Sequence, residues 1–159
     1  MKTKKTVIDK IREDNTEITR YRRLIAAQSA LGLIDFSLIS LFQLGFIKSM
    51  PDLPGKVFDT EKVNSSQDAV LLGMPDGFVS LGAYTATMLL ATAATRFKKQ
   101  SRILDVAMGA VILGQAAGAA QYLYKMAFVQ KKVCIYCVAG AVINFSSLSP
   151  MLKILKRRD

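Results

Sequence analysis

Four long apolar runs constrain this chain more than any other feature of its sequence. They cover residues 24–47, 77–95, 103–128 and 133–155. A helix needs about 20 predominantly apolar residues to cross a bilayer, and each run approaches or exceeds that length. Lipid leaves a spanning backbone few alternatives to the helix. The pattern therefore predicts an all-α fold, an integral membrane four-helix bundle.

The runs divide the 159 residues into three parts. Residues 1–23 form a basic N-terminal segment, 24–155 the membrane domain with a polar loop over 48–76, and 156–159 a basic tail. Apolar residues at near-helical spacing in the first segment favour a short helix on the membrane surface, although a solvated, frayed tail fits equally well. Pro150 is expected to kink the last helix or to end it early.

The basic residues predict how the bundle is oriented. The chain is 51% hydrophobic and yet carries a formal charge of +10. Sixteen of its 22 Lys and Arg residues lie in the N-terminal segment, in the link 96–102 and near the C-terminus, on one side of the predicted bundle. The positive-inside rule then places both termini in the cytoplasm and the loop 48–76 outside. No basic patch with interleaved aromatics is present, so we expect a lipid bilayer as partner and no nucleic acid.

Cys134 and Cys137 are the only cysteines, and they open the fourth run. Residues i and i+3 of a helix share a face, so the two sulfurs can meet as a dithiol or a disulfide. Free N–H groups at the helix start, with Lys131 and Lys132 nearby, favour the thiolate. The outward side is also where disulfides persist. The pair predicts redox chemistry, and an inert structural pair is the alternative.

Other residue types narrow the choice of chemistry. The chain has no histidine, which excludes imidazole catalysis and leaves too few ligands for a zinc site. Asp35 lies inside the first run, either as a protonated or hydrogen-bonded carboxyl facing the bundle interior or as a catalytic group. Gly114 and Gly118 form a small-xxx-small motif, which favours packing within the bundle over dimerisation.

Two sequence pieces resemble the vitamin K epoxide reductase family of quinone-linked membrane thiol oxidoreductases. The resemblance covers residues 24–150. One piece is Cys134-Ile135-Tyr136-Cys137 at the start of the fourth run. The other is the motif Val63-x-x-Ser66-x-x-Ala69-x-x-x-Gly73-Met74-Pro75, with Tyr84 nine residues after the proline.

The resemblance implies four helices around a quinone, menaquinone or ubiquinone, in a prokaryotic cytoplasmic membrane. It implies that Cys137 passes electrons to the quinone and that Cys134 exchanges disulfides with a donor. Both would lie on the extracytoplasmic side. The cofactor-binding residues it implies are Ser66 at the family's hydroxyl position, Asp76 near a quinone carbonyl, Ser80 in place of a usual glycine, and Tyr84.

This sequence departs from the family in its outer loop. Members usually carry two shuttle cysteines there, which relay electrons from a thioredoxin-like protein. The second would fall at Thr60, and this loop has no cysteine. We therefore expect an enzyme that works without the relay, directly with a reductant or a separate thioredoxin-like protein. The alternative is a non-enzymatic protein of this fold that binds quinone or a partner protein.

Overall fold

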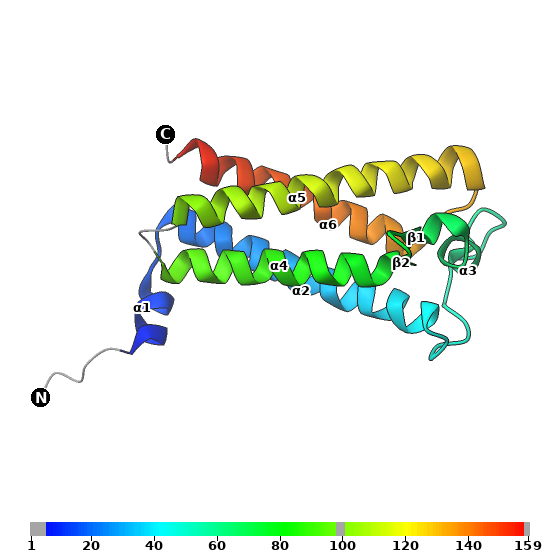
Figure 1. Ribbon diagram of the computed structural model, residues 1–159, viewed down its shortest axis with the longest axis horizontal. Helices are drawn as coiled ribbons and strands as arrows, with labels where there is room; N and C mark the ends of the chain where they lie inside the picture. The colour runs from blue at the N-terminus through cyan, green and yellow to red at the C-terminus, as the bar shows by residue number, and fades with distance from the viewer. Residues whose placement is uncertain (1–5, 98–100, 158–159) are drawn as a thin grey trace, which may run out of the picture.

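A computed structural model describes residues 6–97 and 101–157, and long helices dominate it (Figure 1). Four helices are long and apolar enough to cross a membrane, which confirms the predicted membrane bundle. The elements in chain order are α1 (Val7–Glu13), α2 (Glu17–Gln43), α3 (Thr60–Asn64), η1 (Gln67–Ala69), β1 (Val70–Leu71), β2 (Met74–Pro75), α4 (Asp76–Arg96), α5 (Ser101–Tyr124), the π-helical turn η3 (Lys125–Gln130) and α6 (Ile135–Lys156).

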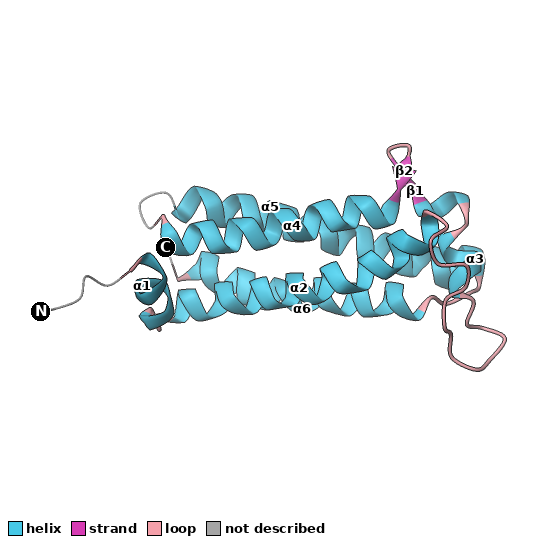
Figure 2. Ribbon diagram, turned by 90° about the horizontal axis from the view of Figure 1, so that it is seen from below, coloured by secondary structure: helices cyan, strands magenta, loops and turns pink. Residues whose placement is uncertain are grey.

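The four long helices form a ring in which each packs against two neighbours. Helix α2 contacts α4 and α6, and α5 contacts the same two helices from the other side. They run roughly parallel to one long axis (Figure 2). Two glycines allow close approach: a Cβ at Gly140 would lie 2.7 Å from the Phe36 ring, and one at Gly77 would lie 2.7 Å from the Ser40 hydroxyl. The absence of a side chain at these two glycines lets α2 pack closely against α6 and α4.

Two helix boundaries differ from the sequence prediction. Helix α2 begins at Glu17, seven residues before the predicted span, because the Thr16 side chain caps it by accepting from the Thr19 N–H. Pro150 does not end α6, which continues to Lys156. A proline removes one helical N–H, and the bundle around the buried Pro150 holds the helix together across that gap.

The predicted polar loop is an ordered cap on one end of the bundle. It holds α3, η1 and the antiparallel β1–β2 hairpin. A bridge joins it to the start of α6, where Val133 N–H donates to Val57 and Asp59 N–H donates to Val133. The cap and the start of α6 thus share one end, and α1 lies at the other (Figure 1).

Each end of the bundle has its own buried cluster. Near α1, Ile25, Met108 and Ile112 pack with Met151 and Ile154, beside a buried ion pair in which Arg22 donates to Asp105 at 2.8 and 3.0 Å. Near the cap, Ile39, Met50, Val63 and Met126 pack with both cysteines. Six basic residues used for the predicted orientation lie outside the described residues: Lys2, Lys4, Lys5, Lys98, Lys99 and Arg158.

Candidate functional site: a thiol pair beside a cavity

The two cysteines form the first turn of α6. Cys134 is the N-cap residue, and its sulfur accepts a hydrogen bond from the Cys137 N–H at 3.1 Å. Both are free thiols. Cys134 is 0% exposed and Cys137 is 9% exposed, so the cap and the bundle shield the pair from water.

A loop residue contacts both sulfurs. Asn64, at the end of α3, donates from Nδ2 to Cys134 Sγ at 3.2 Å, and its Oδ1 lies 3.7 Å from Cys137 Sγ. Thr60, one turn earlier on α3, is also fully buried. The position where a shuttle cysteine was expected from the resemblance therefore belongs to the helix that covers Cys134.

These neighbours lower the pKa of the Cys134 thiol. The largest cause is a hydrogen bond from the Cys137 side chain, and burial acts in the opposite direction. The Cys137 N–H and the side chains of Asn64 and Thr60 add to the lowering. Lys132, which was expected to assist, instead pairs with Asp59 at 3.5 Å.

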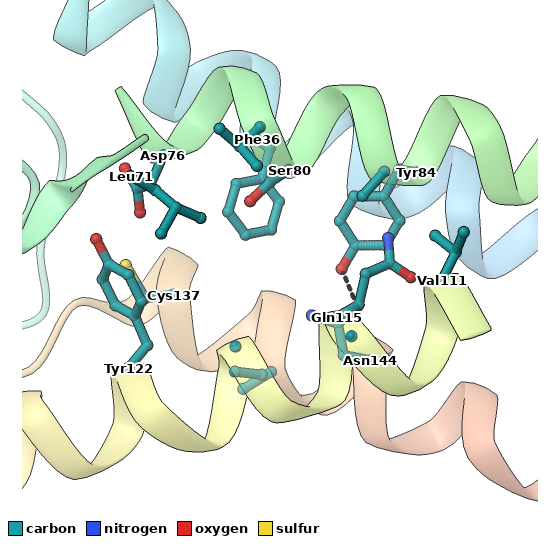
Figure 3. A pocket seen from close by; sticks show the side chains of 16 residues that line it. Phe36, Leu71, Asp76, Ser80, Tyr84, Val111, Gln115, Tyr122, Cys137 and Asn144 are labelled. Atoms are coloured by element: carbon teal, nitrogen blue, oxygen red, sulfur yellow. Dashed lines mark hydrogen bonds between the residues drawn. The ribbon is translucent and has the colours of Figure 1, made fainter. Parts of the chain in front are cut away.

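A cavity of about 260 Å³ begins at the thiol pair and extends into the bundle (Figure 3). Cys137 lines it and Cys134 does not. Asp76 and Tyr122 lie at the cap end with Cys137, and Tyr84, Gln115 and Asn144 lie at the deep end, with Phe36 and Ser80 between them.

Polar groups stand at both ends of this cavity. At the cap end, Gln43 donates to Asp76 Oδ1 at 2.6 Å. At the deep end, the Tyr84 hydroxyl donates to Asn144 Oδ1 at 2.8 Å, which leaves the Asn144 Nδ2 hydrogens for another acceptor. Gln115 Nε2 is buried and has no hydrogen-bond partner among the described residues. Such a donor is costly to bury unless a ligand or water accepts from it.

The predicted site residues do not all gather at the cavity. Cys137, Asp76, Ser80 and Tyr84 line it. Ser66 lies in the cap instead, where its hydroxyl donates to the Val63 carbonyl at 2.8 Å and accepts from Gln130 at 3.0 Å. That bonding gives Ser66 a role in holding the cap on η3.

Two further predictions have different outcomes. Asp35 lies at the interface of α2 and α6, beside Gly140, and is not among the cavity residues. This favours the interior carboxyl over the catalytic group. The expectation that Gly114 and Gly118 pack against a neighbouring helix is wrong: an added Cβ at either would meet nothing within 4 Å, and both line the cavity. Because these two residues of α5 are glycines, no side chain fills this part of the cavity.

Asn64, Gln115 and Asn144 were not predicted. Asn144 follows Cys137 by seven residues, two helical turns along the same face, and a polar residue there within an apolar run was a usable signal. Asn64 offered no such signal, because its contact with the cysteines depends on how the loop folds. Within the described residues, no group of three or more Cys, Asp or Glu side chains is placed to hold a metal ion.

Comparison with known protein families identifies the family of this chain. No curated protein matches the chain. The model of the vitamin K epoxide reductase family matches residues 23–150, which is most of the sequence. The matched region includes all of α4 and α5, most of α2 and α6, the cap and the thiol pair. The chain therefore belongs to the vitamin K epoxide reductase family.

Proposed function

We propose that this protein is a quinone-linked thiol/disulfide oxidoreductase that acts through Cys134 and Cys137. Membership of the family suggests a function of this kind. The observation that carries the proposal is the asymmetry of the pair: Cys137 lines the cavity, while Cys134 lies behind it under α3. One sulfur thus faces a bound acceptor and the other faces the loop.

The cavity fits a quinone ring in size. A dry cavity of about 150 Å³ takes benzene, which scales to about 25 Å³ for each ligand heavy atom. A space of about 260 Å³ therefore holds roughly ten heavy atoms, enough for a benzoquinone ring with its oxygens and small substituents. An isoprenoid tail would extend beyond it.

The polar groups fit the two oxygens of such a ring. Asn144 Nδ2 and the unpartnered Gln115 Nε2 are donors for a carbonyl at the deep end. Asp76 and Ser80 lie nearer the thiol pair. Tyr84 holds Asn144 in place through its hydroxyl. Most other side chains that line the cavity are apolar, such as Val79, Ala83 and Val111, and would limit contact between the ring and water.

The chemistry is a two-electron exchange. A quinone bound in the cavity would supply the acceptor for two electrons and two protons and would be reduced to hydroquinone. The protein gives up the two thiol protons and two electrons and gains one S–S bond between Cys134 and Cys137. The lowered pKa of Cys134 favours loss of its proton, which disulfide formation with Cys137 requires, and the two electrons released would pass to the bound quinone.

The basic residues support an orientation for this reaction. Both termini would be cytoplasmic, and the cap and the thiol pair would face the extracytoplasmic side of a prokaryotic inner membrane. Four apolar helices suggest a multi-pass membrane protein. A separate thioredoxin-like protein on the outer side would then return electrons to Cys134.

One observation favours a second function. The cap of this chain has no shuttle cysteine, and it buries Cys134 completely. A protein that binds a quinone or a partner without cycling its thiols would show the same closed cap. Release of hydroquinone by the protein would distinguish the oxidoreductase from a protein that only binds.

The test measures thiol oxidation in the purified protein, reduced and held in lipid nanodiscs. A short-chain quinone is added, and the Cys134–Cys137 disulfide is followed by the loss of two mass units and of alkylation. We expect stoichiometric disulfide formation and hydroquinone release. Cys137→Ala should abolish hydroquinone release, whereas Ser65→Ala, at the exposed residue that follows α3, should leave it unchanged. Full activity of Cys137→Ala would refute the proposal.

A further inference from the structure

Asn64 bonds to the thiol pair in a way that depends on the protons of the pair. Its Nδ2 donates to the Thr60 carbonyl at 2.8 Å and to Cys134 Sγ at 3.2 Å. Its Oδ1 lies 3.7 Å from Cys137 Sγ and accepts the S–H proton that Cys137 also directs toward Cys134. Asn64 is 3% exposed, so water does not replace these partners.

Oxidation of the pair removes both contacts. When the disulfide forms, two protons and two electrons leave the sulfurs and an S–S bond of about 2.05 Å draws them together. Cys137 then has no S–H to donate, and Cys134 Sγ, now bonded to a second sulfur, is a weaker hydrogen-bond acceptor. The Asn64 amide is left buried with one donor and one acceptor unfilled, which is an unfavourable state for α3.

Helix α3 is also the element that covers Cys134. Besides the packing of Val63 and the backbone bond from Asp59 to Val133, it is held by three bonds to neighbouring segments: Thr60 N–H to Asp52, Met50 N–H to Glu61 and Lys132 to Asp59. A five-residue helix with such anchors can separate from the bundle without disturbing the four long helices.

We propose that Asn64 is a positioning residue that couples the docking of α3 to the redox state of the thiol pair. Helix α3 is closed over the dithiol and released over the disulfide. Cys134 is then exposed to a reductant only when there is a disulfide to reduce, which reconciles its burial with exchange in this cap without cysteines. The inference rests on the proposed function only in that the pair cycles.

Hydrogen exchange measures this coupling directly. The amides of Lys62, Val63 and Ser65 are protected by bonds within α3. Two unfilled buried groups are expected to shift the closed-to-open ratio of α3 by roughly 10- to 100-fold. Exchange of a peptide over 59–65 should therefore be faster by that factor after oxidation with diamide than after reduction with a phosphine, while peptides from α5 keep one rate.

Variants separate Asn64 from the rest of the helix. Asn64→Leu, of similar volume, and Asn64→Ala should each give one exchange rate in both redox states. Lys62→Gln, at an exposed position on the same helix, should keep the wild-type difference. A Cys134→Ser/Cys137→Ser protein should show no response to either reagent. Intact α5 protection in every variant shows that the bundle is folded.

The outcomes are distinct. If the disulfide forms and the exchange of 59–65 does not change, the coupling is refuted while the proposed function stands. If the change persists in both Asn64 variants, Asn64 is not the coupling residue. If neither diamide nor the short-chain quinone forms a Cys134–Cys137 disulfide, the proposed function fails, and with it the premise that the pair cycles.

Discussion

Filling the cavity from α5 tests whether it is the quinone site. Gly118→Leu adds four carbon atoms at a position where an added Cβ meets nothing within 4 Å. At about 25 Å³ per heavy atom, the new side chain occupies roughly 100 Å³ and leaves about 160 Å³ of the original 260 Å³. A benzoquinone ring with its two oxygens has eight heavy atoms and needs roughly 200 Å³ by the same scaling. The ring no longer fits.

We expect KM for a short-chain quinone to rise at least tenfold, which corresponds to about 1.4 kcal/mol of lost binding. Stability should not fall, because a glycine in a helix interior costs about 1 kcal/mol relative to a good helix former. Gly82→Leu is the matched control: it also has open space around its Cβ, on α4, but it does not line the cavity. Equal KM values for the two variants would show that the quinone binds elsewhere.

Three further outcomes follow from contacts described above. Gly140→Ala should overpack against Phe36 and reduce the free energy of unfolding by about 1–3 kcal/mol, measured by thermal unfolding in detergent; an unchanged midpoint would contradict the close α2–α6 approach. Arg22→Met breaks a buried pair with Asp105 and should cost about 3–5 kcal/mol while leaving quinone KM unchanged, since the pair lies at the opposite end of the bundle; a raised KM would refute this separation. Because the pKa of Cys134 is lowered, its thiolate persists to lower pH in the folded protein, and stability from this shift is lost as pH falls through the folded value. The rate of diamide oxidation should accordingly inflect below the ordinary thiol pKa of about 8.5, and an inflection at or above it would be evidence against the hydrogen bonds to Cys134.

The sequence predicted what depends on periodicity and local chemistry. Four apolar runs gave the four long helices, and the spacing of Cys134 and Cys137 at the start of a run gave the first turn of α6. Hydrophobic length and the i, i+3 geometry are properties of a single segment, so they need no knowledge of its neighbours.

What the sequence did not predict depends on contacts between segments. Asn64 reaches the sulfurs only because the cap folds over α6, and Ser66 is turned away from the cavity for the same reason. In the sequence alone, the motif Gly114–Gly118 is typical of a helix-packing surface. Only the arrangement of the four long helices shows that no side chain fills the space beside it. Pro150 reads as a helix breaker, yet tertiary packing carries α6 past it.

The complete burial of Cys134 has a consequence for which oxidants the protein meets. Hydrophilic agents such as peroxide attack exposed thiolates, and a sulfur with 0% exposure is withheld from them although its pKa is lowered. The nearest way to the pair is the mostly apolar cavity beside Cys137, which admits molecules that partition into hydrocarbon. In the proposed oxidoreductase, selectivity against irreversible damage would thus come from the solubility of the oxidant rather than from its reduction potential.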